Sequence, residues 1–241
     1  MKSSLSPHST DLMSANATHV IQFEHVSVRY NRGPEILSDI NLELRPKSFT
    51  FLTGSSGAGK STLLKLCYLS LKPSRGLVHL FGQDISLLTR QENLATKRRI
   101  GVIHQDFRLI DHLSVFENVA LPLRVMEKSR DEYTQDVTEL LQWVGLGHKM
   151  DAKPQTLSGG EQQRAAIARA VIAKPDILIA DEPTGNVDIG LGRRLLRLFS
   201  EMNRMGTTVF IATHDTALMQ EISADILTLK EGQLFSKINA G

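Results

Sequence analysis

The sequence predicts an α/β fold: a core of parallel strands covered by helices, with an N-terminal antiparallel β subdomain and an inserted helical subdomain. Three observations predict this fold. Short apolar runs alternate with helical patterns, as expected of a parallel core; they lie near residues 48–54, 100–104, 176–183 and 207–215. Two segments, at residues 20–30 and 36–46, alternate with period two, as antiparallel strands do, and residues 106–173 show helical spacing. A chain of 241 residues with 41% hydrophobic residues suits one such domain.

The first half of the chain begins with the two alternating segments, which read as antiparallel strands joined at "NRGP". A short buried strand, "SFTFLTG", leads into a glycine-rich loop, and a helix is expected from Lys60 to Leu71, ended by Pro73. "GLVHLFGQDI" is expected to form one further strand and residues 100–104 another.

The second half is expected to begin with the helical segments "SVFENVALPL", "DVTELLQWVGL" and "EQQRAAIARAVIA", with Trp143 in the core. Strands then follow in "DILIADEP" and "TTVFIATHD", separated by a helix from Ile189 to Met205 that Gly206 ends. "DILTLKEGQLF" predicts a closing hairpin that turns at Glu231-Gly232.

The bulk composition excludes several classes of protein. A formal net charge of +2 gives no electrostatic footprint for nucleic acid, and the basic run at residues 97–99 is expected to be a solvated helix end. The single cysteine, Cys67, excludes an internal disulfide framework and is expected to be buried. The sequence contains no apolar run of roughly 18 residues, so no direct membrane span is expected, and residues 1–19 are expected to be a disordered tail.

The glycine-rich loop carries the first chemical motif. "GSSGAGKS" matches Gly-x-x-x-x-Gly-Lys-Ser between a strand and a helix, which predicts a P-loop NTPase with a RecA-like parallel sheet core. Backbone N–H groups would wrap the β-phosphate, Lys60 would bridge the β- and γ-phosphates, and the Ser61 hydroxyl would ligate Mg²⁺. The expected ATP-binding residues of the loop are Gly54, Ser55, Ser56, Gly57, Ala58, Gly59, Lys60, Ser61 and Thr62.

Two adjacent acids end the strand "DILIADEP". Asp181 is expected to hold Mg²⁺ through water, and Glu182, which should point elsewhere because side chains alternate along a strand, would polarise the attacking water. Taken alone, adjacent acids would more simply cap a loop. The lysine loop upstream favours the catalytic interpretation.

A second pair of glycines begins the helix in "LSGGEQQR". Ser158 and Glu161 satisfy the capping-box pattern, so a well-capped helix is the simple account. That account leaves Gly159 and Gly160 unexplained, because glycine in a helix costs up to about 1 kcal/mol relative to alanine. Glycine permits a close approach to the backbone, so the sequence predicts a second anion site at this helix start.

These residues resemble the signature sequence of ABC-type ATPases, and the resemblance extends from Val20 to about Gly232. It implies one ATPase domain over residues 20–241 with a helical subdomain at about 106–173. In that family two ATP molecules are sandwiched between head-to-tail protomers. The resemblance therefore implies a homodimer in the ATP-bound state, in which ATP is contacted in trans by Ser158, Gly159, Gly160 and Asp188.

The resemblance also assigns single landmarks. Tyr30 matches the aromatic residue that stacks on adenine, and His214 in "IATHD" matches the histidine that contacts the γ-phosphate. Gln105 in "VIHQD" matches the glutamine that contacts Mg²⁺ and the attacking water. The implied catalytic set is Glu182, His214 and Gln105, and the implied Mg²⁺ set is Ser61, Gln105 and Asp181.

"DEPTGNVD" resembles a branch of the family that serves bacterial cell division, lipoprotein release and export. The cell-division members fit best, which implies hydrolysis of ATP with water to ADP and phosphate, an integral membrane partner, and a cytoplasmic location at the inner face of the cell membrane, without nucleic acid. The alternatives are a lipoprotein-release (LolD-like) or export (MacB-like) subunit, a soluble DNA-repair ATPase, or a slowly hydrolysing nucleotide-gated scaffold. The separation of Lys60 from Ser158 is too short for the coiled coil of the DNA-repair class.

The stretch "QDFRLIDHL" is expected, from the same resemblance, to form a groove for a short helix of the membrane partner. Phe107, Leu109 and Ile110 would then be exposed groove residues. The competing interpretation is that they belong to the core, and the sequence does not decide between the two.

Overall fold

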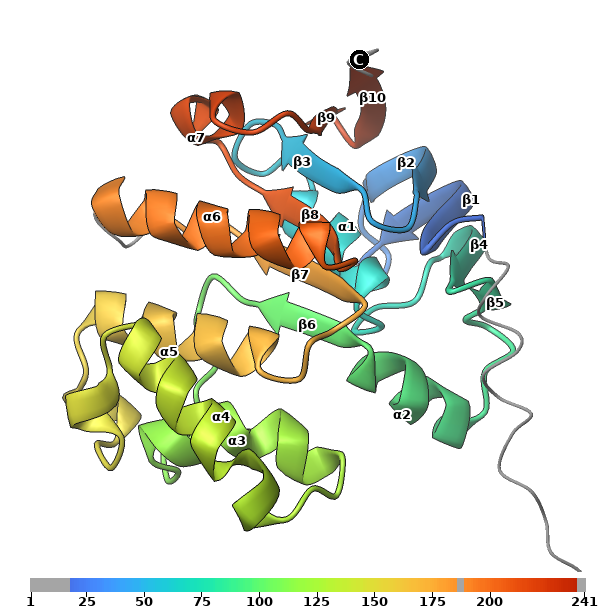
Figure 1. Ribbon diagram of the computed structural model, residues 1–241. Helices are drawn as coiled ribbons and strands as arrows, with labels where there is room; N and C mark the ends of the chain where they lie inside the picture. The colour runs from blue at the N-terminus through green and yellow to red at the C-terminus, as the bar shows by residue number, and fades with distance from the viewer. Residues whose placement is uncertain (1–17, 186–188, 238–241) are drawn as a thin grey trace, which may run out of the picture.

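The computed structural model describes residues 18–185 and 189–237 (Figure 1). Most of the expected tail and Asp188 lie outside these ranges. The fold is built on two sheets, a six-stranded sheet of order β10-β9-β3-β8-β7-β6 and a four-stranded sheet of order β2-β1-β4-β5. Figure 1 shows the helical subdomain as a separate layer beside β6, so the predicted fold class is confirmed.

The six-stranded sheet is parallel except at one edge. Parallel pairing joins β9, β3, β8, β7 and β6 in that order, and only β10 runs antiparallel, in a hairpin with β9. The turn of this hairpin is at Glu231-Gly232, as predicted. The strands are β3 (Phe49–Thr53), β6 (Ile100–Ile103), β7 (Ile177–Asp181), β8 (Thr208–Ala212), β9 (Asp225–Lys230) and β10 (Gln233–Lys237).

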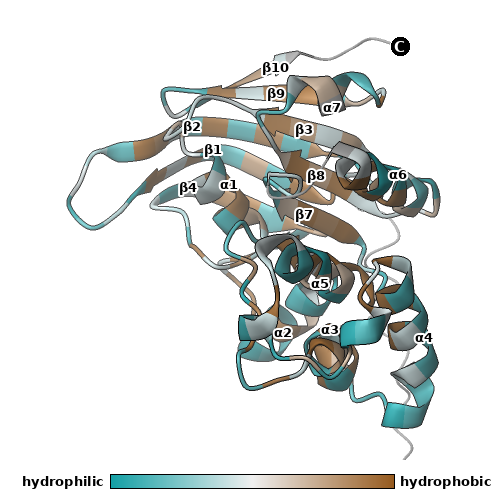
Figure 2. Cartoon of the chain, turned by 90° about the vertical axis from the view of Figure 1, so that its left-hand side faces the viewer, coloured by the Kyte–Doolittle hydropathy of each residue, from teal (hydrophilic) through white to brown (hydrophobic). Residues whose placement is uncertain are grey.

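Alternate residues of the central strands supply two hydrophobic cores. Ile177 and Ile179 of β7 pack with α1 (Lys60–Cys67) and the four-stranded sheet, whereas Leu178 and Ala180 pack with α5 (Gly159–Val171), α6 (Ile189–Arg204) and α7 (Thr216–Gln220). This is the double burial that a continuous apolar strand predicts. In Figure 2, β7 and β8 are brown along their length while α4 shows teal toward the outside.

The four-stranded sheet is antiparallel, with strands β1 (Ile21–Arg29), β2 (Glu35–Leu44), β4 (Arg75–Leu80) and β5 (Gln83–Asp84). The predicted hairpin of β1 and β2 is confirmed. The single strand predicted at "GLVHLFGQDI" is wrong, because the chain reverses there between β4 and β5. Gly82 adopts a φ of 77° in that turn, a conformation that glycine takes without the strain of a Cβ.

The helical subdomain contains α3 (Val115–Val125), α4 (Arg130–Trp143), the short 3₁₀ turns η1 (Gly147–Lys149) and η2 (Pro154–Thr156), and α5. It has a hydrophobic cluster of its own, which includes Val119, Val137 and Leu141. Capping boxes begin α3 at Ser114 and α5 at Ser158, so the side-chain pattern that predicted the start of α5 is confirmed.

Several boundaries differ from the expectations. The helix after the glycine loop ends at Cys67 rather than Leu71, because Leu69 adopts a left-handed φ of 57°. The predicted core residue Trp143 is 52% exposed. Cys67 is fully buried, as expected.

The basic run at residues 97–99 is only partly a solvated helix end. Lys97 and Arg98 are exposed at the end of α2 (Arg90–Arg98). Arg99 instead lies with its guanidinium 3.6 Å from the centre of the Phe81 ring, and its Nε lies 2.5 Å from a carboxylate oxygen of Asp176. Arg99, directly before β6, therefore links the start of this strand to Phe81 and to Asp176, the residue before β7.

Candidate nucleotide-binding site

The glycine-rich loop connects β3 to α1 and is shaped by its glycines. Gly57 and Gly59 have left-handed φ angles of 79° and 104°. A Cβ on Gly59 would lie 2.9 Å from the Leu37 side chain, whereas a Cβ on Gly57 would meet nothing within 4 Å. No side chain caps α1, whose N-cap residue is Gly59. The first N–H groups of α1 therefore remain available to an anion.

The Lys60 ammonium lies over this loop. Its Nζ donates hydrogen bonds to the carbonyl oxygens of Gly54, at 2.8 Å, and Ser55, at 3.1 Å. Both acceptors are neutral. The positive charge of Lys60 is therefore held at the loop by carbonyl dipoles, and no carboxylate neutralises it among the ion pairs of the described residues.

A cleft of about 750 Å³ opens in front of the loop. It brings together residues that are far apart in the sequence, from the glycine loop, the end of β6, the end of β7 and the end of β8. The lining residues are Ile36, Gly54, Ser55, Ser56, Gly57, Gly59, Lys60, Ser61, Thr62, Gln105, Asp181, Glu182, Gly185 and His214. The predicted residue Ala58, in the same loop, is buried and does not line the cleft.

The two adjacent acids turn to different partners, as predicted, although β7 ends at Asp181 and Glu182 already lies outside the strand. Asp181, the last residue of β7, is hydrogen-bonded to Ser61 at the start of α1, and burial raises the pKa of its carboxyl group. Glu182 has a left-handed φ of 51°, and its N–H donates to the carbonyl oxygen of Ala212 at 2.9 Å. Its carboxylate lies 2.9 Å from Nδ1 of His214.

His214 projects into the open part of the cleft from the end of β8. Its side chain is 76% exposed, and the hydrogen bond and negative charge of Glu182 raise its pKa above the ordinary value. Protonation of the imidazole is therefore coupled to the Glu182 carboxylate.

The donor set suits magnesium that is held partly by phosphate. Ser61, Asp181 and Gln105 all line the cleft and offer oxygen atoms, the ligand type that Mg²⁺ prefers. Within the described residues no group of three or more histidine, cysteine or acidic side chains could hold a metal ion by itself. This fits Mg²⁺, which usually keeps several waters and shares its coordination with substrate phosphates.

Tyr30 lies beside the cleft rather than in its lining. It is 39% exposed, and its hydroxyl oxygen lies 3.4 Å from Oγ1 of Thr62, the residue that follows the phosphate loop motif. An exposed ring at this position is available for stacking on a flat ligand.

The second glycine pair lies outside the cleft. Ser158 caps α5, and its backbone N–H and hydroxyl donate to the Glu161 carboxylate at 2.8 and 3.0 Å. The Lys149 ammonium and these donors lower the pKa of Glu161 to about 2. Ser158, Gly159 and Gly160 are absent from the lining of the cleft, and a Cβ on Gly159 would meet nothing within 4 Å. This helix start faces open space.

Sequence reasoning missed two polar residues of α5. Gln163 is 2% exposed and donates from Nε2 to the carbonyl oxygen of Pro183, directly after Glu182. Arg169 donates to the carbonyl oxygens of Phe107 and Arg108, two and three residues after Gln105. Arg169 lies within the apolar run "AAIARAV", where a polar side chain without water needs an internal partner, and that pattern was the available signal. Gln163 belongs to the polar run "EQQR" before it and carries no such signal.

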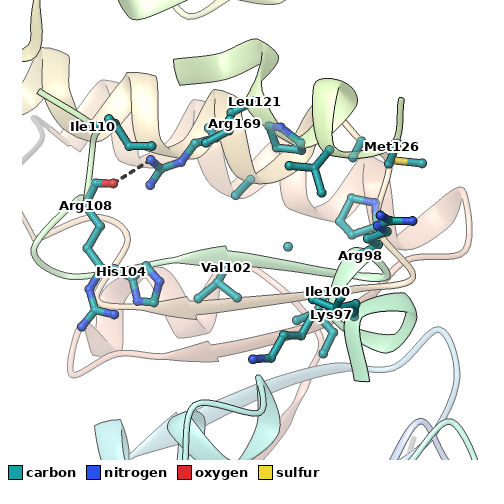
Figure 3. Close-up of a pocket in the computed structure, with 17 residues that line it drawn as sticks. Lys97, Arg98, Ile100, Val102, His104, Arg108, Ile110, Leu121, Met126 and Arg169 are labelled. Carbon is teal, nitrogen blue, oxygen red and sulfur yellow. Dashed lines mark hydrogen bonds between the residues drawn. The ribbon is translucent and has the colours of Figure 1, made fainter. Parts of the chain in front are cut away.

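A groove of about 450 Å³ lies between α2, β6, α3 and α5 (Figure 3). Of the three residues over which the sequence left two interpretations open, Ile110 lines this groove, Leu109 packs against the core of the helical subdomain, and Phe107 does neither. Leu94 and Val125, which are 51% and 49% exposed, line it from α2 and α3. Among the described residues that line the groove none is acidic, and four are arginine or lysine.

None of the described helices combines the length and the apolar content that crossing a bilayer requires.

The model of the ABC transporter family matches residues 37–185. The chain is 47% identical over 215 residues to the cell division ATP-binding protein FtsE of Escherichia coli, an alignment that covers 89% of this chain and 97% of that protein. Identity to FtsE of Bacillus subtilis is 38%, over 88% of this chain and 93% of that protein.

Two solved structures share the fold. A dimeric bacterial ABC transporter cassette superposes with a TM-score of 0.86 at 33% identity, and a dimeric cassette in a post-hydrolysis state bound to ADP and Pi superposes with a TM-score of 0.85 at 32% identity. Each alignment covers 92% of this chain and 99% of the other. By this similarity the chain is an ATP-hydrolysing cassette, and it belongs to the ABC transporter family.

Proposed function

We propose that this chain is the ATPase subunit of a bacterial cell-division complex of the FtsE–FtsX type, in which closure of a head-to-tail dimer on ATP acts on an integral membrane subunit. The observation that carries this proposal is the division of the phosphate-binding features between two faces. Lys60, Asp181, Glu182 and His214 share one cleft, whereas the glycine pair at the start of α5 lies outside it. A site that uses both requires two chains.

Within the cleft, each group has a role that follows from its chemistry. Lys60 and the N–H groups of the loop bind the β- and γ-phosphates. Mg²⁺, held by Ser61 and Asp181 with Gln105 beside them, would neutralise charge on the phosphate oxygens. Glu182 accepts a proton from the attacking water, and His214 holds both that carboxylate and the γ-phosphate.

Residues of the second chain complete the site. The N–H groups of Gly159 and Gly160 and the Ser158 hydroxyl bind the γ-phosphate of ATP that is held by the partner's loop, because a helix start attracts an anion and glycine lets it approach the backbone closely. At Gly159 even a Cβ would meet nothing within 4 Å. Asp188 is assigned to the same interface by its position after "DEPTGN". Tyr30 stacks on the adenine ring.

The membrane subunit docks in the groove between α2 and α3. The exposed apolar residues of this groove, Leu94 and Val125, suit contact with the apolar face of a short helix of the membrane subunit. Docking there places the ATPase at the cytoplasmic face of the cell membrane without a span of its own. His104 and Gln105 directly follow β6; because His104 lines the groove and Gln105 lines the cleft, the end of this strand borders both sites.

The nucleotide part of the proposal is tested with Glu182→Gln. This variant should bind ATP and Mg²⁺, lose hydrolysis by at least about 10²-fold, and accumulate as an ATP-dependent dimer in light scattering. Adding Ser158→Arg should abolish the dimer. A dimer that persists with Ser158→Arg would show that the glycine pair only caps α5.

The membrane part is tested by co-sedimentation with vesicles that contain FtsX. Val125→Asp and Leu94→Asp should lose recruitment and keep ATP binding, whereas Leu87→Asp, at a 79% exposed residue outside the groove, should be recruited normally. Equal recruitment of all three variants would reject the groove. Failure of the wild-type chain to bind FtsX vesicles while it binds vesicles with a LolD-type or MacB-type membrane subunit would reject the cell-division role.

A further inference from the structure

The turn that follows Gln105 has an unfavourable backbone. Phe107 and Arg108 are consecutive non-glycine residues with left-handed φ angles of 57° and 50°. In this region a Cβ crowds the neighbouring carbonyl, so two such residues in succession persist only where other contacts hold them. The turn that positions Gln105 therefore needs an external anchor.

Arg169 of α5 supplies that anchor. Its Nη1 donates to the carbonyl oxygen of Arg108 at 2.6 Å and its Nη2 to the carbonyl oxygen of Phe107 at 2.7 Å. Figure 3 shows the guanidinium reaching from α5 across the groove to the turn. Burial lowers the pKa of Arg169, and no carboxylate pairs with it among the described ion pairs. Two backbone carbonyls thus satisfy a largely desolvated cation.

The rest of the loop is held by the same subdomain. Asn118 of α3 bonds both the N–H and the carbonyl of Ile110, Gln155 donates to the carbonyl of Asp111, and Lys153 donates to that of His112. Of these contacts from the helical subdomain, those of Arg169 are made to the residues nearest to Gln105 in the chain. β6 ends at Ile103, two residues before Gln105, so Arg169 bonds the loop shortly after the chain leaves the sheet for the helical subdomain.

We propose that Arg169 is a positioning residue for ATP hydrolysis: by fixing the turn at Phe107 and Arg108 it makes Gln105 follow the movements of α5. The same helix begins at Ser158, so the start of α5 and Gln105 move together. This inference rests on the role proposed above for Gln105 at Mg²⁺ and the attacking water. A guanidinium is required because it donates to two carbonyls at fixed geometry, which an ammonium does not reproduce.

Steady-state ATPase assays of Arg169→Lys test the proposal. Its kcat should fall about 10-fold, with the binding of a fluorescent ATP analogue unchanged within about twofold and a higher Mg²⁺ concentration needed for half-maximal rate. Arg124→Lys, the same change at an exposed residue of α3, is the matched control and should behave as wild type. A proportional loss of analogue binding would indicate general damage to the site and overturn the proposal.

A double-mutant cycle separates this inference from the role of Gln105. If Arg169 acts through Gln105, the rate of Arg169→Lys combined with Gln105→Ala should equal that of Gln105→Ala alone. Multiplied losses would overturn the inference and leave Gln105 in its role. An unimpaired Gln105→Ala variant would instead overturn the role proposed for Gln105.

A spectroscopic signature covers the case in which Arg169→Lys is too unstable for kinetics. Cys67 is fully buried and burial raises the pKa of its thiol, so a nitroxide will label an added Arg108→Cys thiol selectively. The motion of the label, read from its spectral line shape, should be more restricted in the protein with Arg169 than in the Arg169→Lys variant. Both proteins are measured folded, below their melting temperatures. Equal line shapes would mean that Arg169 does not fix the turn.

Discussion

Replacing Asn118 by leucine should lower the free energy of unfolding by about 2–3 kcal/mol, because this residue organises the loop between the cleft and α3. Asn118 is 0% exposed. Its Oδ1 accepts from the N–H of Ile110 at 2.7 Å, and its Nδ2 lies 3.0–3.2 Å from the carbonyl oxygens of Ile110, Leu113 and Ser114.

The magnitude follows from the number of atoms that can bond. Nδ2 carries two hydrogens, so the side chain makes about three full hydrogen bonds, each worth about 1 kcal/mol net. Leucine has a similar volume and leaves no large cavity, but it leaves the buried Ile110 N–H and the carbonyl groups without the hydrogen bonds of Asn118. Burial of its extra apolar surface offsets up to about 1 kcal/mol of the loss.

Urea denaturation, followed by circular dichroism without nucleotide, measures the effect. Asn93→Leu on α2 is the matched control: Asn93 is half-buried, and its side chain makes no hydrogen bond in the described part of the chain. The control should change stability by less than about 0.5 kcal/mol. A loss below about 1 kcal/mol for Asn118→Leu would refute the assignment of the loop's stability to this side chain.

Four further outcomes test the site. Lys60→Ala should weaken ATP binding by about 10- to 100-fold, the equivalent of about 1.5–3 kcal/mol for charge-assisted bonds, while the melting temperature stays unchanged, as fluorescent-analogue titration and thermal denaturation will measure. Because burial raises the pKa of Asp181, its ionised form costs stability above the ordinary pKa of 3.8; Asp181→Asn should therefore raise the melting temperature at pH 7 without nucleotide, and this gain should vanish near pH 3. Glu182→Gln should return the pKa of His214 toward its ordinary 6.5, as an NMR titration will show; the stability from this pair is fully present below the unfolded pKa and lost as pH rises through the folded one. Glu161 has a pKa lowered to about 2, so its contribution is present above its ordinary 4.5 and lost as pH falls toward 2; the stability difference between wild type and Glu161→Gln should shrink across that window in acid-denaturation curves.

Local sequence was sufficient where a function depends on adjacent residues. The phosphate loop is one strand-loop-helix unit, so its spacing predicted both its place in the fold and the cleft residues Lys60 and Ser61. The end of β7 could be predicted in the same way, because an apolar run followed by two acids marks the point where a buried parallel strand ends.

Contacts between distant segments could not be read in the same way. Arg169 lies 61 residues from the carbonyl of Arg108 that it bonds, and no local pattern names that partner. Likewise, whether Phe107, Leu109 and Ile110 face a core or a groove depends on how α3 and α5 pack beside them.

Trp143 shows a different failure. The apolar side of α4 is formed by Tyr133, Val137 and Leu141, at intervals of four residues. At roughly 100° per residue Trp143 lies about 120° from the centre of that side, at the helix end. Its hydrophobic character favoured the core, but its angular position on the helix does not.

The pairing of Ser158 with Glu161 has a consequence for how strongly a second chain can grip nucleotide. The start of α5 already holds an anion of its own: the Glu161 carboxylate accepts from the Ser158 N–H and hydroxyl and from the Lys149 ammonium. A phosphate group that arrives there must share these donors or displace the carboxylate from them. The free energy of phosphate binding at this helix end is therefore reduced by the cost of losing the Glu161 contacts. Weaker binding of phosphate favours a dimer from which ADP and phosphate can dissociate.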